Sequence, residues 1–382
     1  EFFGYFGQQK QRPKDSSGTQ FSREPAPGYF GESFGSESSS TAQRRSRGDL
    51  NLASVGPKLE APKSKLEKLV LASDMPLSSA MSLDWTIQLF SWCAQTLIHL
   101  ELQCREIPSE TWQYFFSEIN LPSLQHFRIA NDKAMVQLSD ILKFLSRHPS
   151  IRTLRLLDGI HLPPSPPSSL PTPILPNLEQ MVACPAYLQW LLQDENQCPE
   201  LKEITLLTGY WYSFFRPLSY DLVDTTLENV LLPQSHKLDT IGFTLTREHP
   251  DLDAWLQSHV SSSAEGGSNA ETSVTNKRIL PRFVHTKHLR IDSMSFSDII
   301  ESNSRTQTGP SRLELIARFA GSFPDLEYLE LDISPADGLI TRVVDAIRQH
   351  CPQVKKLKIG HASAKDIGQF GQSGSGNVVN AS

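Results

Sequence analysis

The chain contains Cys198-Pro199-Glu200-Leu201-Lys202-Glu203-Ile204-Thr205-Leu206 and repeats it closely as Cys351-Pro352-Gln353-Val354-Lys355-Lys356-Leu357-Lys358-Ile359. In both copies the proline is followed by apolar residues at relative positions 1, 4 and 6. Neither a helix nor a simple alternating strand has this spacing. A short strand does, if its last two apolar side chains point into the core and the first fills the corner before the strand.

The same apolar triplet recurs along most of the chain. Four successive copies, beginning at Leu97, Leu124, Ile151 and Leu178, start 27 residues apart, and a fixed period of this size is typical of a solenoid. Leu289-Ile291 is a weaker copy, and Leu227-Val230-Leu232 competes with the copy that begins at Leu238. The other copies are Leu66-Leu69-Leu71, Leu201-Ile204-Leu206, Leu238-Ile241-Phe243, Leu326-Leu329-Leu331 and Val354-Leu357-Ile359.

Helical spacing fills the segments between the strands, for example in 138–145, 313–320 and 343–347. Burying the apolar side chains of one repeat contributes roughly 10–20 kcal/mol, whereas ordering its residues costs roughly 40 kcal/mol. Single repeats therefore cannot fold alone and must share a core with their neighbours. The sequence predicts an irregular right-handed α/β superhelix, with a parallel sheet on its concave face and helices on its convex face.

Composition sets the predicted boundaries. Residues 1–60 and 361–382 are rich in Gly, Ser and polar residues without apolar periodicity, which predicts disorder. Residues 61–360 form the predicted solenoid, with loop insertions near 161–176, 261–278 and 303–311.

Charge and cysteine content narrow the function classes. The formal net charge of −6 argues against nucleic acid or a membrane surface as the main partner. No apolar run approaches the roughly 18 residues of a membrane-spanning helix. Five scattered cysteines fit reduced core residues in the cytoplasm or nucleus better than a disulfide framework.

The repeat unit, a helix followed by Cys-Pro-x-Leu-x-x-Leu-x-Leu, resembles the cysteine-containing leucine-rich repeats of F-box proteins. The resemblance spans about Leu66 to Gly360 and is best at Gln197–Leu206, Ser322–Asp332 and Gln349–Ile359. It implies an adaptor that holds a protein substrate on its repeats while the F-box docks onto a cullin-type ubiquitin-ligase core. Residues 1–60 lack the Leu-Pro-led helical pattern of an F-box, so we expect that module upstream of Glu1 or absent.

Residues at positions 3, 5 and 7 of each strand segment are expected to face the concave surface. Their mixed charges favour a protein partner over nucleic acid, for which Lys and Arg would predominate. The alternative is that many are only solvated strand positions. The candidates are His99, Glu101, His126, Arg128, Arg155, Glu203, Arg290, Tyr328, Glu330, Lys356 and Lys358, with Gln103, Thr153, Thr205, His288, Asp292 and Asp332 in the wider set.

An aromatic loop directly after one strand is a second candidate. Tyr210, Trp211 and Tyr212 have the composition of an interface anchor, although packing as the core of an irregular repeat is an equal alternative.

The sequence gives little support for a metal site or a catalytic site. Cys93, His99 and Cys104 lack the spacing of a zinc finger, and no Walker loop, Gly-x-Ser-x-Gly or His-Glu-x-x-His motif occurs. The sequence thus predicts a monomeric protein-binding module, not an enzyme, that needs no cofactor or metal. The favoured role is substrate recognition for an F-box-like ubiquitin-ligase adaptor, and the alternative is a stand-alone repeat scaffold without a ligase link.

Overall fold

The computed structural model describes residues 65–130, 136–157, 159–162, 173–208, 219–245, 251–260, 279–293, 310–332, 339–360 and 364–367. The described residues all belong to one compact unit. The segment 1–60, the insertion 261–278 and most of 161–176 and 303–311 lie outside them, so their predicted disorder stays a prediction.

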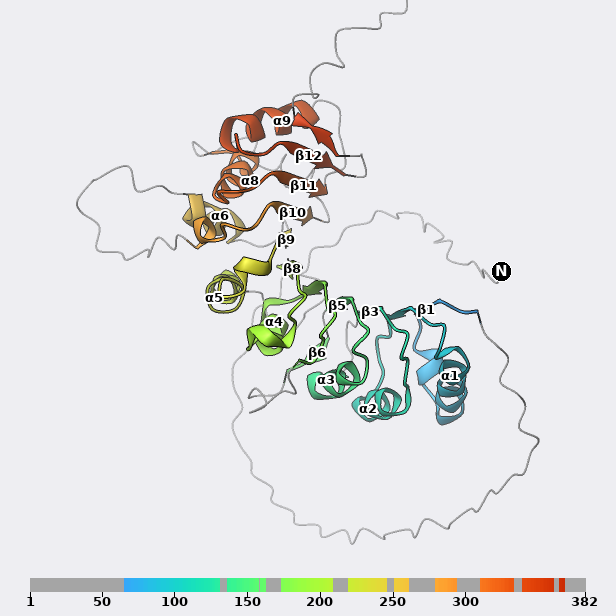
Figure 1. Ribbon diagram of the computed structural model, residues 1–382. Coiled ribbons are helices and arrows are strands. Elements are labelled where there is room, and N and C mark those ends of the chain that lie inside the picture. The colour runs from blue at the N-terminus through green and yellow to red at the C-terminus, as the bar shows by residue number, and fades with distance from the viewer. Residues whose placement is uncertain are drawn as a thin grey trace, which may run out of the picture. The chain divides into compact units, whose positions relative to one another are not determined.

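One large sheet carries most of the described chain, and its strands follow chain order (Figure 1). Neighbouring strands pair in parallel, except that β13 pairs antiparallel with β12. The strands of this sheet are β1 (Lys68–Leu71), β2 (His99–Leu102), β3 (His126–Ile129), β5 (Thr153–Leu156), β7 (Gln180–Ala183), β8 (Glu203–Leu207), β9 (Thr240–Leu245), β10 (His288–Ser293), β11 (Tyr328–Asp332), β12 (Lys356–Ile359) and β13 (Lys365–Asp366). A separate two-stranded sheet joins β4 (Val136–Gln137) to β6 (Ile160–His161).

Eight α-helices occur in the described residues, and Figure 1 shows them on one face of the large sheet. They are α1 (Ala80–Cys93), α2 (Ser109–Glu118), α3 (Leu138–Ser146), α4 (Pro185–Leu191), α5 (Tyr220–Thr226), α6 (Leu252–Val260), α8 (Arg312–Gly321) and α9 (Leu339–His350). The predicted α/β class with a parallel sheet is thus confirmed.

A recurring hydrogen bond sets the register between strands. The amides of Gln125 and His126 both donate to the Ile98 carbonyl, and those of Arg152 and Thr153 both donate to the Gln125 carbonyl. The same two-to-one pattern recurs at the entrances of β7, β8, β10, β11 and β12. Because neighbouring strands start in the same register, the apolar residues of successive triplets lie side by side in rows across the sheet.

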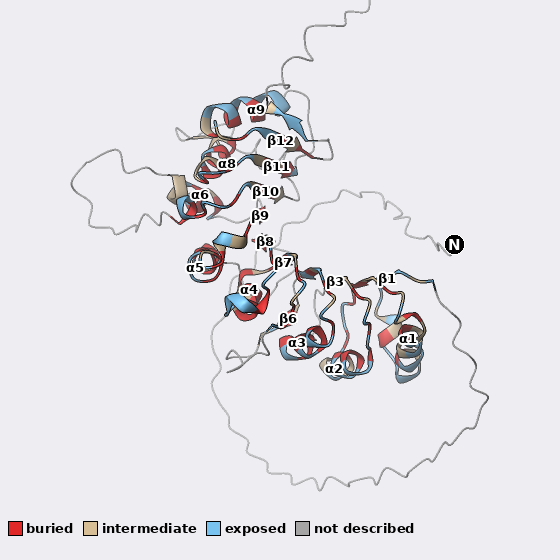
Figure 2. Ribbon diagram, viewed as in Figure 1, coloured by how far each residue is buried: buried red, intermediate tan, exposed pale blue. Residues whose placement is uncertain are grey.

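These rows form the core between sheet and helices. The triplet residues of β2 to β12 are almost all fully buried, including Leu100, Phe127, Leu289 and Leu357. Figure 2 shows the helices with buried residues on the surface that turns towards the strands and exposed residues on the opposite surface. Burying one stripe of each helix against the sheet is the packing that helical spacing predicted.

The cysteines of the repeated stretch belong to this core. All five cysteines are free, and Cys198 and Cys351 are buried. The Cys351 thiol donates to the Ala317 carbonyl of the preceding repeat at 2.7 Å. Burial raises the pKa of both thiols to about 12, which makes them unreactive packing residues.

Two segments differ from the simplest reading of the pattern. Of the two competing triplets, the one at Leu238 leads into strand β9, whereas Leu227–Leu231 forms a π-helical turn after α5. Residues 364–367, which composition assigned to the disordered tail, include β13 and pair with the outer edge of β12.

Candidate functional site

The side of the sheet that the helices leave uncovered carries two rows of in-register side chains, which we call the open face. Every second residue of each strand contributes to it, as expected for a pleated strand. Row one is Lys68, His99, His126, Thr153, Gln180, Glu203, Thr240, His288, Tyr328 and Lys356. Row two is Val70, Glu101, Arg128, Arg155, Val182, Thr205, Gly242, Arg290, Glu330 and Lys358.

A first charged cluster lies over β2 and β3. Arg128 Nη1 donates to Glu101 Oε1 at 2.9 Å, and Gln103 Nε2 also donates to Glu101. Glu101 is buried, so these partners replace the water that its carboxylate would otherwise bind. Burial, assisted by the charges of Lys68 and His126, lowers the pKa of His99, which therefore stays neutral at pH 7.

A second cluster lies over β10 to β12. Lys358 Nζ donates to Glu330 Oε1 at 2.7 Å, and His288 Nε2 lies 3.5 Å from the other carboxylate oxygen. Although burial opposes it, the Lys358 hydrogen bond and the Arg290 charge lower the pKa of Glu330. The Tyr328 ring stacks on the His288 ring with centroids 4.2 Å apart. The cluster thus offers paired charges and one aromatic surface.

Small or uncharged residues separate the two clusters. Row two passes through Val182, Thr205 and Gly242 before it reaches Arg290. A Cβ added at Gly242 would lie 2.5 Å from Thr205 Oγ1, so a larger residue there would have to displace the threonine side chain. Arg155 and Glu203 are the charged residues beside this central part.

The structure places eleven of the candidate residues on the open face, but it brings only some of them together. Glu101 pairs with Arg128, and Glu330 pairs with Lys358. Lys356 lies opposite Tyr328 in row one. The aromatic loop residues Tyr210, Trp211 and Tyr212 lie outside the described residues, so their role stays a prediction.

Sequence reasoning did not select four open-face residues, Gln180, Val182, Thr240 and Gly242. Their strands were recognised from the apolar triplets, but the candidates were drawn mainly from charged and aromatic residues. The signal was present in the repeat, because positions 3 and 5 of every copy face the same side.

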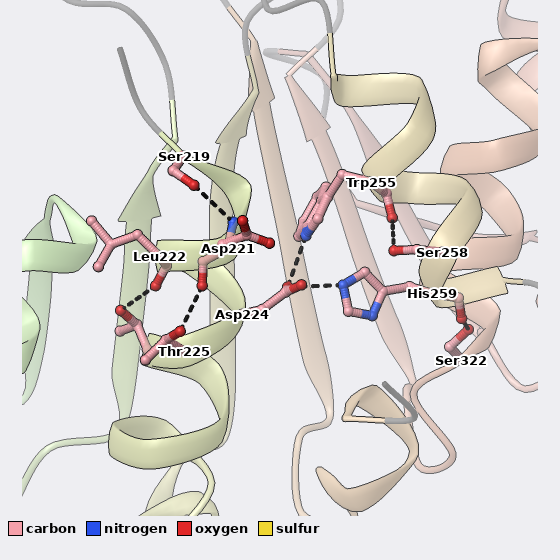
Figure 3. Close-up of polar contacts among 10 residues, drawn as sticks. Ser219, Asp221, Leu222, Asp224, Thr225, Trp255, Ser258, His259 and Ser322 are labelled. Carbon is pink, nitrogen blue, oxygen red and sulfur yellow. Dashed lines mark hydrogen bonds and ion pairs between the residues drawn. The ribbon is translucent and has the colours of Figure 1, made fainter. Parts of the chain in front are cut away.

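A buried carboxylate–histidine pair on the helix side is a different kind of site (Figure 3). Asp224 Oδ1 accepts a hydrogen bond from Trp255 Nε1 at 2.8 Å and lies 3.0 Å from His259 Nε2. An Asp–His pair can activate a serine in hydrolases. Here Ser258 donates to the Trp255 carbonyl and Ser322 to the carbonyls of His259 and Arg318, so neither hydroxyl is directed at the imidazole. The pair instead ties α5 to α6.

Metal and membrane chemistry can be assessed only for the described part of the chain. Within it, no group of three or more His, Cys, Asp or Glu side chains could hold a metal ion. None of its helices combines the length and the apolar character that crossing a bilayer requires.

Comparison with known proteins adds no assignment. No protein-family model matches the chain, and no curated protein matches it.

Proposed function

We propose that residues 61–360 form a leucine-rich-repeat solenoid whose concave surface is the open face, and that this surface binds a protein partner. We further propose that the partner is a substrate held for a cullin-type ubiquitin ligase, as the resemblance to F-box repeat proteins implies. The alternative is a stand-alone scaffold that binds its partner without a ligase link.

The observation that carries the proposal is the open face itself. It is a broad surface of in-register side chains that the helices leave free, and its charges have both signs. Protein partners recognise such surfaces through complementary charge and a few aromatic or arginine anchors. Nucleic acid would favour an excess of Lys and Arg, which the pairing of Glu101 with Arg128 and of Glu330 with Lys358 argues against.

The proposal also covers catalysis, cofactors, oligomeric state and cellular compartment. The protein acts by binding and not by catalysis, needs no cofactor, and functions as a monomer. Its free cysteines suit the reducing conditions of the cytoplasm or nucleus.

Two matched lysine substitutions test the proposal. Lys358 and Lys355 both pair with a glutamate of the preceding strand segment, at 2.7 and 3.0 Å, but only Lys358 lies on the open face. The full-length gene product is expressed with an affinity tag, and captured proteins are quantified by mass spectrometry. We expect Lys358→Ala to lose specific partners and Lys355→Ala to retain them.

Whether cullin-ligase components are captured distinguishes the adaptor from the stand-alone scaffold. Their recovery with both variants supports the adaptor, since the F-box would bind them away from the open face. Partner capture without any ligase component supports the scaffold. Equal capture of all partners by the two variants would contradict binding through this part of the open face.

A further inference from the structure

Helices α2 and α3 lie side by side (Figure 1), and a cavity of about 230 Å³ lies between them. It belongs to the side of the sheet that the helices cover, so it is separate from the open face. Sites for drug-sized molecules measure roughly 300–1,000 Å³, so this cavity suits only a small ligand. Its lining residues are Gln113, Phe116 and Ser117 of α2, Asp140 and Lys143 of α3, and Arg147 at the C-cap of α3.

The cavity contains a carboxylate that is largely removed from water. Asp140 is only 7% exposed, and no described residue donates a hydrogen bond to its side chain. The Nζ of Lys143 lies 3.6 Å from Asp140 Oδ1, which is an ion-pair distance but too long for a hydrogen bond. The Lys143 side chain is also 73% exposed, so water weakens this ion pair. Because a buried carboxylate without donors is costly, a donor that enters the cavity would be stabilised there.

The position of Asp140 in the helix explains its charge but not its burial. It lies in the first turn of α3, where an acidic residue stabilises a helix. First-turn glutamates elsewhere have donors or water: Glu314 of α8 accepts from the Ser311 amide at 2.7 Å, and Glu110 of α2 is exposed. Asp140 has neither, which indicates that its carboxylate serves the cavity as well as the helix.

The two cations at the cavity have different roles. Arg147 donates to the carbonyls of Phe116, Ser117 and Lys143, so its guanidinium ties the end of α2 to α3 and fixes one wall of the cavity. Lys143 Nζ donates to no described residue, so its three donors are available to a ligand. The cavity therefore presents a buried negative charge and an accessible positive charge side by side.

We propose that this cavity binds a free α-amino acid, with the ligand's ammonium group at Asp140 and its carboxylate at Lys143. An α-amino acid carries both charges on one carbon, which matches two side chains whose charged atoms lie 3.6 Å apart. A purely cationic ligand would face Lys143 and Arg147, whereas a purely anionic ligand would face Asp140. Gln113 and Ser117 add neutral groups that can donate or accept further hydrogen bonds.

Binding of small molecules to the purified full chain tests the proposal. The standard α-amino acids are compared by saturation-transfer NMR, and the strongest binder is titrated by calorimetry. Two analogues of that amino acid are titrated in the same way. The N-acetyl derivative lacks the ammonium group that Asp140 would bind, and the carboxamide lacks the carboxylate that Lys143 would bind. Both analogues are expected to bind at least about tenfold more weakly, because each loses one charge-assisted interaction.

Three variants assign the binding to this cavity. Asp140→Asn should weaken it by about tenfold or more, and Lys143→Gln by about threefold, because the lysine charge is more exposed to water. Asp345→Asn is the matched control, since Asp345 and Arg348 form an ion pair of the same i,i+3 spacing on α9, with 3.9 Å between the charged atoms. This variant should bind the amino acid as the wild type does. A cooperative thermal transition shows that each variant is folded, and the exposed Lys143 supplies a test that does not depend on Asp140→Asn folding.

Several outcomes would overturn the proposal. If no amino acid binds the wild-type protein, Asp140 acts only as a first-turn acid of α3. Unchanged affinity in both Asp140→Asn and Lys143→Gln would place the binding elsewhere on the protein. Equal affinity for the N-acetyl derivative would exclude an ammonium group at Asp140, and equal affinity for the carboxamide would reduce the site to one for simple cations. These results are independent of the open face, because Lys358→Ala should leave amino-acid binding unchanged.

Discussion

The two faces of the sheet differ in how much their residue types vary from strand to strand. On the side that faces the helices, position after position is a buried apolar residue, such as Leu100, Phe127 and Leu329. On the open face the matching positions change from one strand to the next, from Glu101 to Arg128 to Arg155. The covered face repeats because every repeat must fill the same space, while the open face is free to differ and can therefore be specific.

The bonds between repeats also differ. The covered side joins neighbours through groups removed from water, such as His148, whose Nε2 accepts from the Leu121 amide at 2.9 Å. The open face joins neighbours through partly solvated ion pairs, such as Lys358 with Glu330. Substitutions on the covered face should therefore reduce stability, and substitutions on the open face should chiefly reduce binding.

The largest effect is expected from Phe319, which packs between several aromatic rings of the core. Its ring centroid lies 5.4 Å from that of Phe243 and 5.2 Å from that of Trp255. Phe319→Ala should lower the free energy of unfolding by about 4 kcal/mol, because it leaves a cavity among rigid neighbours. Urea denaturation measures this loss, with Phe319→Leu as a milder control. A loss below about 1 kcal/mol, the range of surface changes, would contradict the packing described here.

A slightly smaller effect is expected from the buried Asp224. Asp224→Ala removes the acceptor of both Trp255 and His259 and should cost about 3 kcal/mol. Asp224→Asn keeps an acceptor oxygen and should lose less in the same denaturation experiment. Equal losses in both variants would show that the charge, and not the hydrogen bonding, is what matters.

His148 should make stability depend on pH. Burial, assisted by the charge of Arg147, lowers the pKa of this fully buried imidazole from 6.5 to about 4, although its hydrogen bond to the Phe144 carbonyl opposes the shift. Between these pKa values the unfolded chain binds more protons, so stability is full above about pH 6.5 and falls as the pH decreases. From pH 7 to pH 5 the contribution of His148 should decrease by about 2 kcal/mol.

The His148→Gln variant supplies the reference for that measurement. Glutamine does not titrate, so the difference in unfolding free energy between wild type and variant should shrink as the pH falls. A difference that stays constant over this range would show that His148 does not titrate as its burial implies.

The smallest stability effect is expected on the open face. Lys358→Ala breaks an ion pair that is only partly shielded from water and should change the free energy of unfolding by less than about 1 kcal/mol. Thermal unfolding measures this change, while the capture experiment measures the loss of partners. A large loss of stability would show that the open face contributes to folding as the covered face does, which would contradict the difference expected between the two faces.

Much of the fold was readable because the apolar triplets carry both strand position and orientation. The spacing could not decide between Leu227-Val230-Leu232 and Leu238-Ile241-Phe243, since both fit a strand. Packing decided it: Ile241 and Phe243 align with Ile204 and Leu206 of the preceding strand, while Leu227 belongs to a helical turn. Strand β13 was missed because it has no apolar periodicity, although it pairs antiparallel with β12 at the edge of the sheet.

The open face was predictable in outline and not in detail. Alternation along each strand was enough to propose that Glu101, Arg128 and Glu330 share a surface. Which of them pair depends on the register between strands and on the reach of long side chains, and neither is encoded within a single repeat. Gly242 illustrates this limit, because the need for a glycine there comes from Thr205 on the neighbouring strand, whose Oγ1 would lie 2.5 Å from an added Cβ.

By itself, the sequence determined the repeat, the α/β class and the face on which each strand residue lies, because apolar periodicity is a local property of the chain. The tertiary structure decided which charges are neutralised and which are not, because that depends on contacts between residues many positions apart. The Cys-Pro stretches show both aspects. Their apolar residues and cysteines could be assigned to the core from spacing alone, whereas the ion pair of Lys358 with Glu330 depends on the neighbouring strand.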